Sequence, residues 1–332
     1  MPHTRIALPI VLSLAALFIH LGSPAVAFSQ AWVPIEGDGS VSFTYQNLIG
    51  RYHVDATGTR AKVGTDSAQS ILMDFEYGIT DKLAFNADVV YVASKYKGTF
   101  PERAPWIRFP EGPLDFDASW HPAFQDGHFS LRYNVSKNPL MLTPFISVTV
   151  PTHHYETSGH NAAGRHFHEL VIGVNAGRRL GPILPNFYLH GRYSYTVLKR
   201  FAGLNLNRSN ADWEFGWIAT RRLTLRFLGA SQWTQGGLNF PEDIHPGEEE
   251  FEFHDRVLHA SYFRLGGGAS FSVNKNLDIN LASAGTVSAK NGVVVGGIAI
   301  GFSWRFSRGH DISKTSSRNS LPNVPIAGPG MF

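Results

Sequence analysis

Cysteine is absent from all 332 residues of the sequence. The chain therefore has no disulfide framework and no cysteine to which a lipoprotein anchor could be attached. Charge is also sparse and balanced: charged residues make up 17%, and the formal net charge is +3 with histidine neutral. Because the basic residues are spread along the chain, the sequence offers no footprint for binding nucleic acid.

Long apolar runs are missing as well, apart from one that extends from Ile6 to Ile19. It follows Arg5 and precedes an A-x-A site that ends at Ala27, a combination typical of a bacterial secretory signal. We therefore expect residues 1–27 to be a signal peptide. A membrane anchor would need about 20 apolar residues, and this run is shorter and contains Pro9. No later stretch is long enough for a transmembrane helix, so any membrane that the mature chain occupies has to be spanned by strands.

What the sequence does contain is an alternation of apolar and polar residues with a period of two. It is clearest from Ser70 to Val92, where two alternating limbs flank a turn at residues 80–82. The apolar face carries Ile71, Met73, Phe75, Tyr77, Ile79, Leu83, Phe85, Ala87, Val89 and Tyr91. The opposite face carries Ser70, Asp74, Glu76, Gly78, Asn86 and Asp88. Such strands occur in soluble sandwiches and in outer-membrane barrels, where the apolar face meets lipid.

The same alternation continues to residue 306 and predicts twelve strands. They fall near residues 37–45, 70–79, 83–92, 129–135, 142–150, 170–176, 187–197, 213–217, 223–227, 263–271, 277–281 and 294–306. Five short turns, near residues 81, 138, 182, 221 and 275, alternate with six longer segments. A soluble sandwich has no reason to sort its connections by length in this way.

Sorted connections and an even strand number are typical of outer-membrane barrels. The sequence therefore predicts an all-β fold, namely a transmembrane antiparallel up-and-down β-barrel of about 12 strands over residues 28–306. The polar residues 307–332 are predicted to form a disordered tail.

Charged residues of both signs fall on the polar face of the predicted strands. As lumen-facing candidates for a substrate path they are Arg132, Arg192, Arg226, Arg264, Arg305, Glu76, Asp88 and Glu214. A mixed lining of this kind tends to hold water and to guide solutes. The alternative is that the same charges form pairs that simply fill a narrow barrel.

The stretch Glu76-Tyr77-Gly78-Ile79-Thr80-Asp81-Lys82-Leu83-Ala84-Phe85 resembles a hairpin motif of one outer-membrane family. That family is named after a phenol-degradation pathway (the MetA-pathway family). Residues 131–134, the strand from Thr143 to Pro151 and the closing strand are similar to it too. The resemblance implies an outer-membrane barrel that transports hydrophobic or aromatic compounds, and it implies no catalytic residues. One departure is that this chain continues past Phe306, whereas such barrels usually end at the aromatic residue of the last strand.

Five histidines and two glutamates lie between His153 and Glu169. Neutral imidazole is a common ligand of zinc, copper and nickel. The candidate metal ligands are therefore His153, His154, His160, His166 and His168, of which the last two would share a face if a strand begins there. A polar outer loop that is merely rich in histidine is the alternative, because no fixed spacing such as H-E-x-x-H is present.

Three classes of function fit such a barrel. It could be a channel or transporter for small compounds, an enzyme of the lipase or protease type at the barrel rim, or a structural barrel. An enzyme would have to use pairs such as Ser209 with His190 or His254 with Asp255, yet their spacing does not demand catalysis. We therefore expect a channel, no enzyme and no cofactor. The expected partners are outer-membrane lipids and lipopolysaccharide, the barrel assembly machinery and a small-molecule solute, with no nucleic acid.

Overall fold

The computed structural model describes residues 31–62, 64–98, 118–157, 162–244 and 254–307. The expected signal peptide and residues 308–332 of the expected tail lie outside this range. In the described part, the single helix is α3 (His254–Val257), which has 4 residues. No helix in these ranges is long and apolar enough to cross a bilayer.

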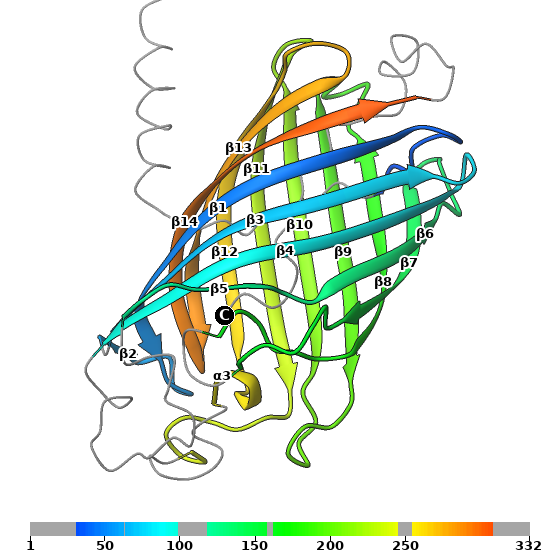
Figure 1. Ribbon diagram of the computed structural model, residues 1–332. Helices are drawn as coiled ribbons and strands as arrows, with labels where there is room; N and C mark the ends of the chain where they lie inside the picture. The colour runs from blue at the N-terminus through cyan, green and yellow to red at the C-terminus, as the bar shows by residue number, and fades with distance from the viewer. Residues whose placement is uncertain (1–30, 63, 99–117, 158–161, 245–253, 308–332) are drawn as a thin grey trace, which may run out of the picture.

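Antiparallel strands close into one barrel (Figure 1). Its twelve wall strands are β1 (Gly39–Val54), β3 (Gly64–Gly78), β4 (Leu83–Gly98), β6 (Gly127–Tyr133), β7 (Met141–Val150), β8 (Glu169–Arg179), β9 (Phe187–Leu198), β10 (Asn207–Ile218), β11 (Leu223–Gln235), β12 (Ser261–Ser272), β13 (Leu277–Lys290) and β14 (Gly292–Phe306). Two short strands, β2 (Arg60–Ala61) and β5 (His121–Phe124), pair only with β1 and β4. Each wall strand pairs with its neighbours in sequence, and β14 pairs with β1 along its whole length, which closes the cylinder. The predicted all-β, twelve-stranded barrel is confirmed.

Each wall strand has an apolar outward face and a largely polar inward face. On β3, Ile71 is 44% exposed whereas the next residue, Leu72, is 1% exposed. On β14, Ile298 is 53% exposed and the adjacent Ala299 is 3% exposed. Since side chains alternate along a strand, the buried positions line the interior of the barrel and the exposed apolar ones form its outer belt. An apolar outer belt of this kind is what transmembrane barrels show.

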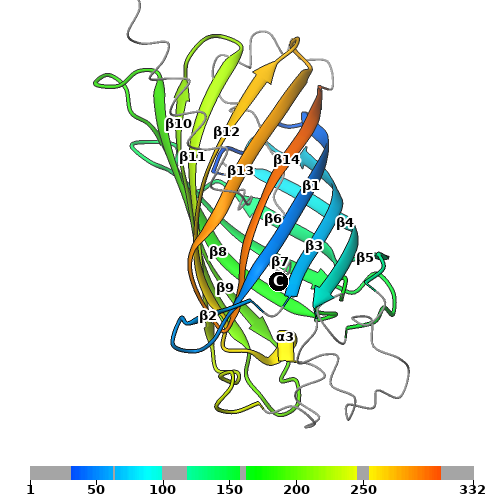
Figure 2. The ribbon, with the colours of Figure 1, turned by 90° about the vertical axis from the view of Figure 1, so that its left-hand side faces the viewer.

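The short turns gather at one end of the barrel. They connect β3 to β4, β6 to β7, β8 to β9, β10 to β11 and β12 to β13. The other end carries longer connections together with β2 and α3, as Figures 1 and 2 show from two sides. The described residues at both ends of the chain, 31–38 and 307, lie next to the short-turn ends of β1 and β14.

One predicted long connection is wrong. The segment between residues 281 and 294 was expected to be a loop, but β13 continues to Lys290 and β14 begins at Gly292. Asn291 alone separates them, with a φ of 47° in the left-handed region that asparagine tolerates better than most residues. The Asn291-Gly292 pair is a strong hairpin signal that explains this tight reversal.

Other strands extend further than the alternation predicted. The chain was expected to form loops at residues 51–67 and from residue 95 onward, yet β1 runs to Val54, β3 begins at Gly64 and β4 continues to Gly98. Inward positions on these three strands carry apolar side chains, including Leu48, Ala68 and Tyr96. They interrupt the polar–apolar pattern from which the strands were predicted.

Candidate channel lumen

All eight predicted lumen residues lie on the inward face of their strands. Glu76, Arg132, Glu214 and Arg226 are buried, and the other four are partly buried. Each of the four partly buried ones has a contact: Asp88 with His128, Arg305 with Asp278, and Arg192 and Arg264 over the rings of Phe145 and Tyr262. The structure thus brings the charges into one interior, but distributes them among local pairs around the wall.

The pair between Arg132 and Glu76 is the most buried of these contacts. Nη2 of Arg132 donates to a carboxylate oxygen of Glu76, and Nε donates to Oδ1 of Asn86 at 2.8 Å. Glu76 and Asn86 are register partners on β3 and β4, and Arg132 reaches them from β6. A buried ion pair requires such extra hydrogen bonds to offset the loss of water. This network therefore joins three neighbouring strands on the inner wall.

A second polar group lies on β9, β10 and β11. The hydroxyl of Tyr188 donates to Glu214, and its ring lies where a side chain at Gly216 would have to be, since a Cβ there would come within 2.0 Å of it. Arg226 is buried nearby, with its Nε and Nη2 lacking a hydrogen-bond partner in the described part of the chain. Arg226 therefore offers the interior two donors that the described protein groups do not use.

Residues 31–38, which we call the N-terminal segment, enter the barrel at the short-turn end. The hydroxyl of Thr143 on β7 donates to the carbonyl of Ala31 at 2.6 Å. The ring of Trp32 packs edge-on against Tyr188 with 6.1 Å between centroids. Gly177 on β8 makes room for this approach, because a Cβ there would lie 2.6 Å from the Trp32 ring. The segment therefore narrows the lumen at this end.

The inner wall toward the long-connection end carries an apolar strip among its polar groups. The strip consists of Leu48, Ala68, Leu72, Val90, Val92 and Val295, on β1, β3, β4 and β14. All six are at most 5% exposed, and they form one cluster with Tyr155 and Ala163 of the connection between β7 and β8. Burial of an apolar strip against a loop is favourable because it removes apolar area from water.

We call residues 151–157 and 162–168 of that connection the inner loop. Its Tyr155 hydroxyl donates to Oδ1 of Asp126 at 2.7 Å and accepts the backbone N–H of His166 at 2.9 Å. The side-chain amide of Gln125 donates to the carbonyl of Ala163. Burial raises the pKa of Tyr155, and the hydrogen bond to Asp126 raises it further, so this phenol stays protonated as the donor. These bonds hold the inner loop inside the barrel.

The inner loop continues into a charged and aromatic layer at the same end. Arg208 on β10 pairs with Glu169, the first residue of β8. The Arg256 guanidinium of α3 lies over the rings of Phe167 and Phe201, at 4.7 Å and 4.0 Å from their centroids. Cation–π contacts of this kind stabilise the position of an arginine. They fix α3 against the inner loop.

Several of these lumen residues were not predicted from the sequence. Leu48, Leu72 and Val90 each lie two residues from a polar inward residue on the same strand. The alternation of side chains therefore places them on the inward face. Arg208 was not among the candidates, although it lies two residues before Asn210 on the same face. Nothing in the alternation of strands predicts the inward path of the N-terminal segment or of the inner loop.

The histidine-rich segment does not form a closed metal centre among the described residues. No group of three or more potential ligands that could hold a metal ion occurs there, and His160 lies outside the described residues. The rings of His154 and His166 are 5.6 Å apart, while Nε2 of His166 contacts the carbonyl of His153 at 3.1 Å. His166 and His168 would share a strand face only if a strand began there, and β8 begins at Glu169.

Metal binding by His153, His154, His160, His166 and His168 thus stays a prediction. Zinc titration of the purified protein by calorimetry tests it. The metal interpretation requires saturable binding to the native protein that disappears in a His166→Ala, His168→Ala variant. A flat titration of the native protein would dismiss it.

One of the two catalytic pairs considered from sequence is ruled out by geometry. Ser209 lies on the outward face of β10, where its hydroxyl contacts Tyr193 and Gln235. His190 lies on the inward face of β9 beside Trp32. The two side chains therefore lie on opposite sides of the wall and cannot act together. His254 and Asp255 are neighbours on α3, with 3.6 Å between Nε2 and Oδ1.

No family model and no curated protein matches this sequence. The resemblance to the phenol-degradation-pathway family therefore stays a prediction. An outer membrane channel from Pseudomonas putida F1 has a similar structure, with a TM-score of 0.63 and 11% identity over 85% of this chain and 100% of that chain. The two chains share the fold.

Two further solved barrels are less similar. The translocator domain of the autotransporter NalP from Neisseria meningitidis has a TM-score of 0.45 and 10% identity, over 90% of this chain and 94% of that one. The CymD monoaromatic hydrocarbon channel has a TM-score of 0.43 and 11% identity, over 83% of this chain and 90% of that one. At these scores neither bears on the function of this chain.

Proposed function

We propose that this protein is a channel in the bacterial outer membrane for small compounds of largely hydrophobic or aromatic character. The observation that carries the proposal is the apolar strip on the inner wall. A barrel interior that only had to hold water would carry polar groups at these positions. An apolar inner surface beside a polar one is suited to a solute that has both an apolar body and a polar group.

The apolar belt on the outside of the barrel supports the membrane location. Its side chains, such as Ile298 and Phe302, are about half exposed (53% and 47%) on a face that has no covering layer in the described structure. Lipid is the environment in which such a belt is stable. We propose that the long connections face outward from the cell, where lipopolysaccharide surrounds the barrel. The description of the similar Pseudomonas putida protein as an outer membrane channel agrees with this proposal.

The path that we propose runs past the two segments that enter the lumen. Tyr155 and Ala163 cover the apolar strip, so a solute that uses the strip takes the place of this part of the inner loop. Exchange of one apolar contact for another leaves the buried apolar area similar, and therefore costs little free energy. The inner loop is thus the element that decides how much of the strip a solute can reach.

Replacement of Tyr155 by Ala is expected to increase single-channel conductance several-fold. The change removes both the ring that covers the apolar strip and the hydroxyl that holds the loop to Asp126. The measurement is single-channel recording in planar bilayers, for native protein and variant side by side. Tyr45→Ala is a matched control, because Tyr45 lies on the outward face of β1.

Equal conductance of the native protein and the Tyr155→Ala variant would contradict the assigned path. If both are electrically silent while the purified barrel hydrolyses lipid or peptide, the enzyme alternative replaces the channel. If both are silent and no hydrolysis occurs, the barrel is structural.

A further inference from the structure

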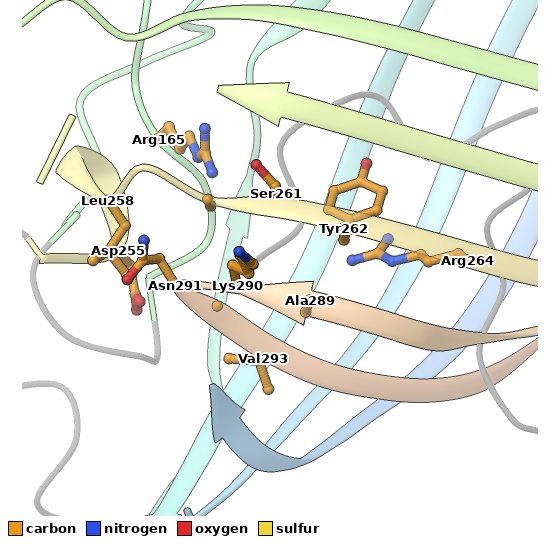
Figure 3. Close-up of a pocket in the computed structure, with 12 residues that line it drawn as sticks. Arg165, Asp255, Leu258, Ser261, Tyr262, Arg264, Ala289, Lys290, Asn291 and Val293 are labelled. Atoms are coloured by element: carbon orange, nitrogen blue, oxygen red, sulfur yellow. The ribbon is translucent and has the colours of Figure 1, made fainter. Parts of the chain in front are cut away.

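A small cavity lies at the long-connection end of the barrel, where β12, β13 and β14 meet α3 and the inner loop. Its volume is about 30 Å³, enough for one or two water molecules. Figure 3 shows that its side chains come from several separate elements of the chain. Its charged lining consists of three cations, Arg165, Arg264 and Lys290, and one carboxylate, Asp255.

The cations are not neutralised by ion pairs within the described chain. Asp255 contacts His254 at 3.6 Å, and Glu169, the other carboxylate of this region, pairs with Arg208. Nε of Arg264 is buried without a hydrogen-bond partner among the described groups. Its guanidinium lies 4.0 Å from the ring centroid of Tyr262, so the side chain is held in place while this Nε–H stays unused.

Arg165 adds a second, partly buried charge at this position, near the carboxylates of Glu169 and Asp255, which act to raise its pKa. Burial, and after it the nearby Arg208 guanidinium, lower the pKa of Arg165 to about 10, so the side chain is still protonated at neutral pH. A buried charge without a partner destabilises a fold, whereas an anion placed beside it would relieve that cost. Two arginines and a lysine line one cavity beside a single carboxylate, and this excess of positive charge favours an anion.

We propose that this cavity binds the carboxylate group of a small organic acid. The planar guanidinium matches a carboxylate with two parallel hydrogen bonds, which favours arginine at such sites. Ser261 lines the same cavity and supplies an uncharged polar group, whereas the amide of Asn291 is already bonded to Asn239, His259 and Phe240. The volume accommodates the head group but not a whole ligand, so the apolar remainder of the acid extends out of the cavity past Tyr262 or Val293. The site goes beyond the proposed channel, because binding here requires no passage through the barrel.

Calorimetric titration of the purified barrel in detergent with benzoate tests this site. We expect the native protein to bind benzoate saturably. The uncharged analogue benzamide should not bind. Arg264→Gln is expected to weaken benzoate binding by about tenfold or more, since a hydrogen bond to a charged group is lost. Arg222→Gln makes the same charge change in an exposed short turn at the opposite end and should leave binding as it is.

A second variant guards against misfolding of Arg264→Gln. Lys290→Gln alters an exposed side chain of the same cavity, and should also weaken benzoate binding. Heat-dependent migration on gels verifies that each variant is a folded barrel. Absence of saturable benzoate binding to the native protein, equal binding of benzamide, or equal benzoate affinity in all folded variants would each overturn the proposal. Benzoate binding by a barrel that conducts no current would keep this site and reject the channel, so the two proposals can fail separately.

Discussion

Replacement of Arg132 by Met is expected to destabilise the barrel by about 3–5 kcal/mol, the usual cost when one partner of a buried ion pair is removed. The substitution removes the cation that pairs with Glu76 and the Nε–H group that donates a hydrogen bond to Oδ1 of Asn86. Both side chains of the pair are almost completely shielded, with exposed fractions of 0% and 4%. Water therefore cannot compensate for the lost contact. Unfolding in urea, followed by circular dichroism in detergent, gives the free energy of unfolding.

The matched variant for this experiment is Arg132→Met combined with Glu76→Met. Removal of both charges leaves neither ion of this pair buried without the other, so most of the lost stability should return. A double variant that is as unstable as the single one would show that packing, and not charge, dominates at this site. A single variant with native stability would mean that the pair contributes nothing to the fold.

Replacement of Ile298 by Arg is expected to destabilise the barrel by about 2–4 kcal/mol, the cost of a charged side chain near the bilayer midplane on the lipid face of a barrel. Ile298 lies in the middle of β14 and is 53% exposed on the outward face. The lost free energy is measured as the shift in unfolding equilibrium in lipid vesicles. Phe85→Arg on β4 tests the same face on another strand.

Ser130→Arg provides the contrast, because Ser130 lies on the inward face of β6 between Asn86 and Ser147. A charge there meets the polar interior, so the loss should be much smaller than at Ile298. The sign of the difference depends only on which face each residue occupies. A larger loss for Ser130→Arg would mean that the inward and outward faces have been exchanged.

The barrel itself was predictable because its pattern is set by simple physics. Alternation of side chains along a strand, combined with an apolar outside, fixes the face of nearly every residue in strands such as β3 and β14. Short turns such as the one at residues 219–222 also follow from local sequence. The tight reversal at Asn291, which was predicted as a longer connection, also has a local signal, the Asn-Gly pair.

What fills the barrel was much harder to predict. The inner loop lies inside the barrel because Tyr155 donates a hydrogen bond to Asp126 and packs against an apolar strip formed by four strands. These contacts join residues that are far apart in the chain, and no periodic pattern reports them. The same holds for Trp32, whose position depends on space left by Gly177. Charges could be assigned to a face by parity, but their partners, such as Glu76 for Arg132, follow only from register and tilt.

The seam between β1 and β14 also sets an order of events during folding. It joins Gly39 to Phe306, the widest separation in the chain among paired wall residues. Contacts at such separation form late, since the entropy of closing the intervening loop has to be overcome first. Until then both edge strands expose unpaired backbone groups, which in lipid are costly and in water invite pairing with other chains. The newly made chain therefore needs protection of its first and last strands until the cylinder closes.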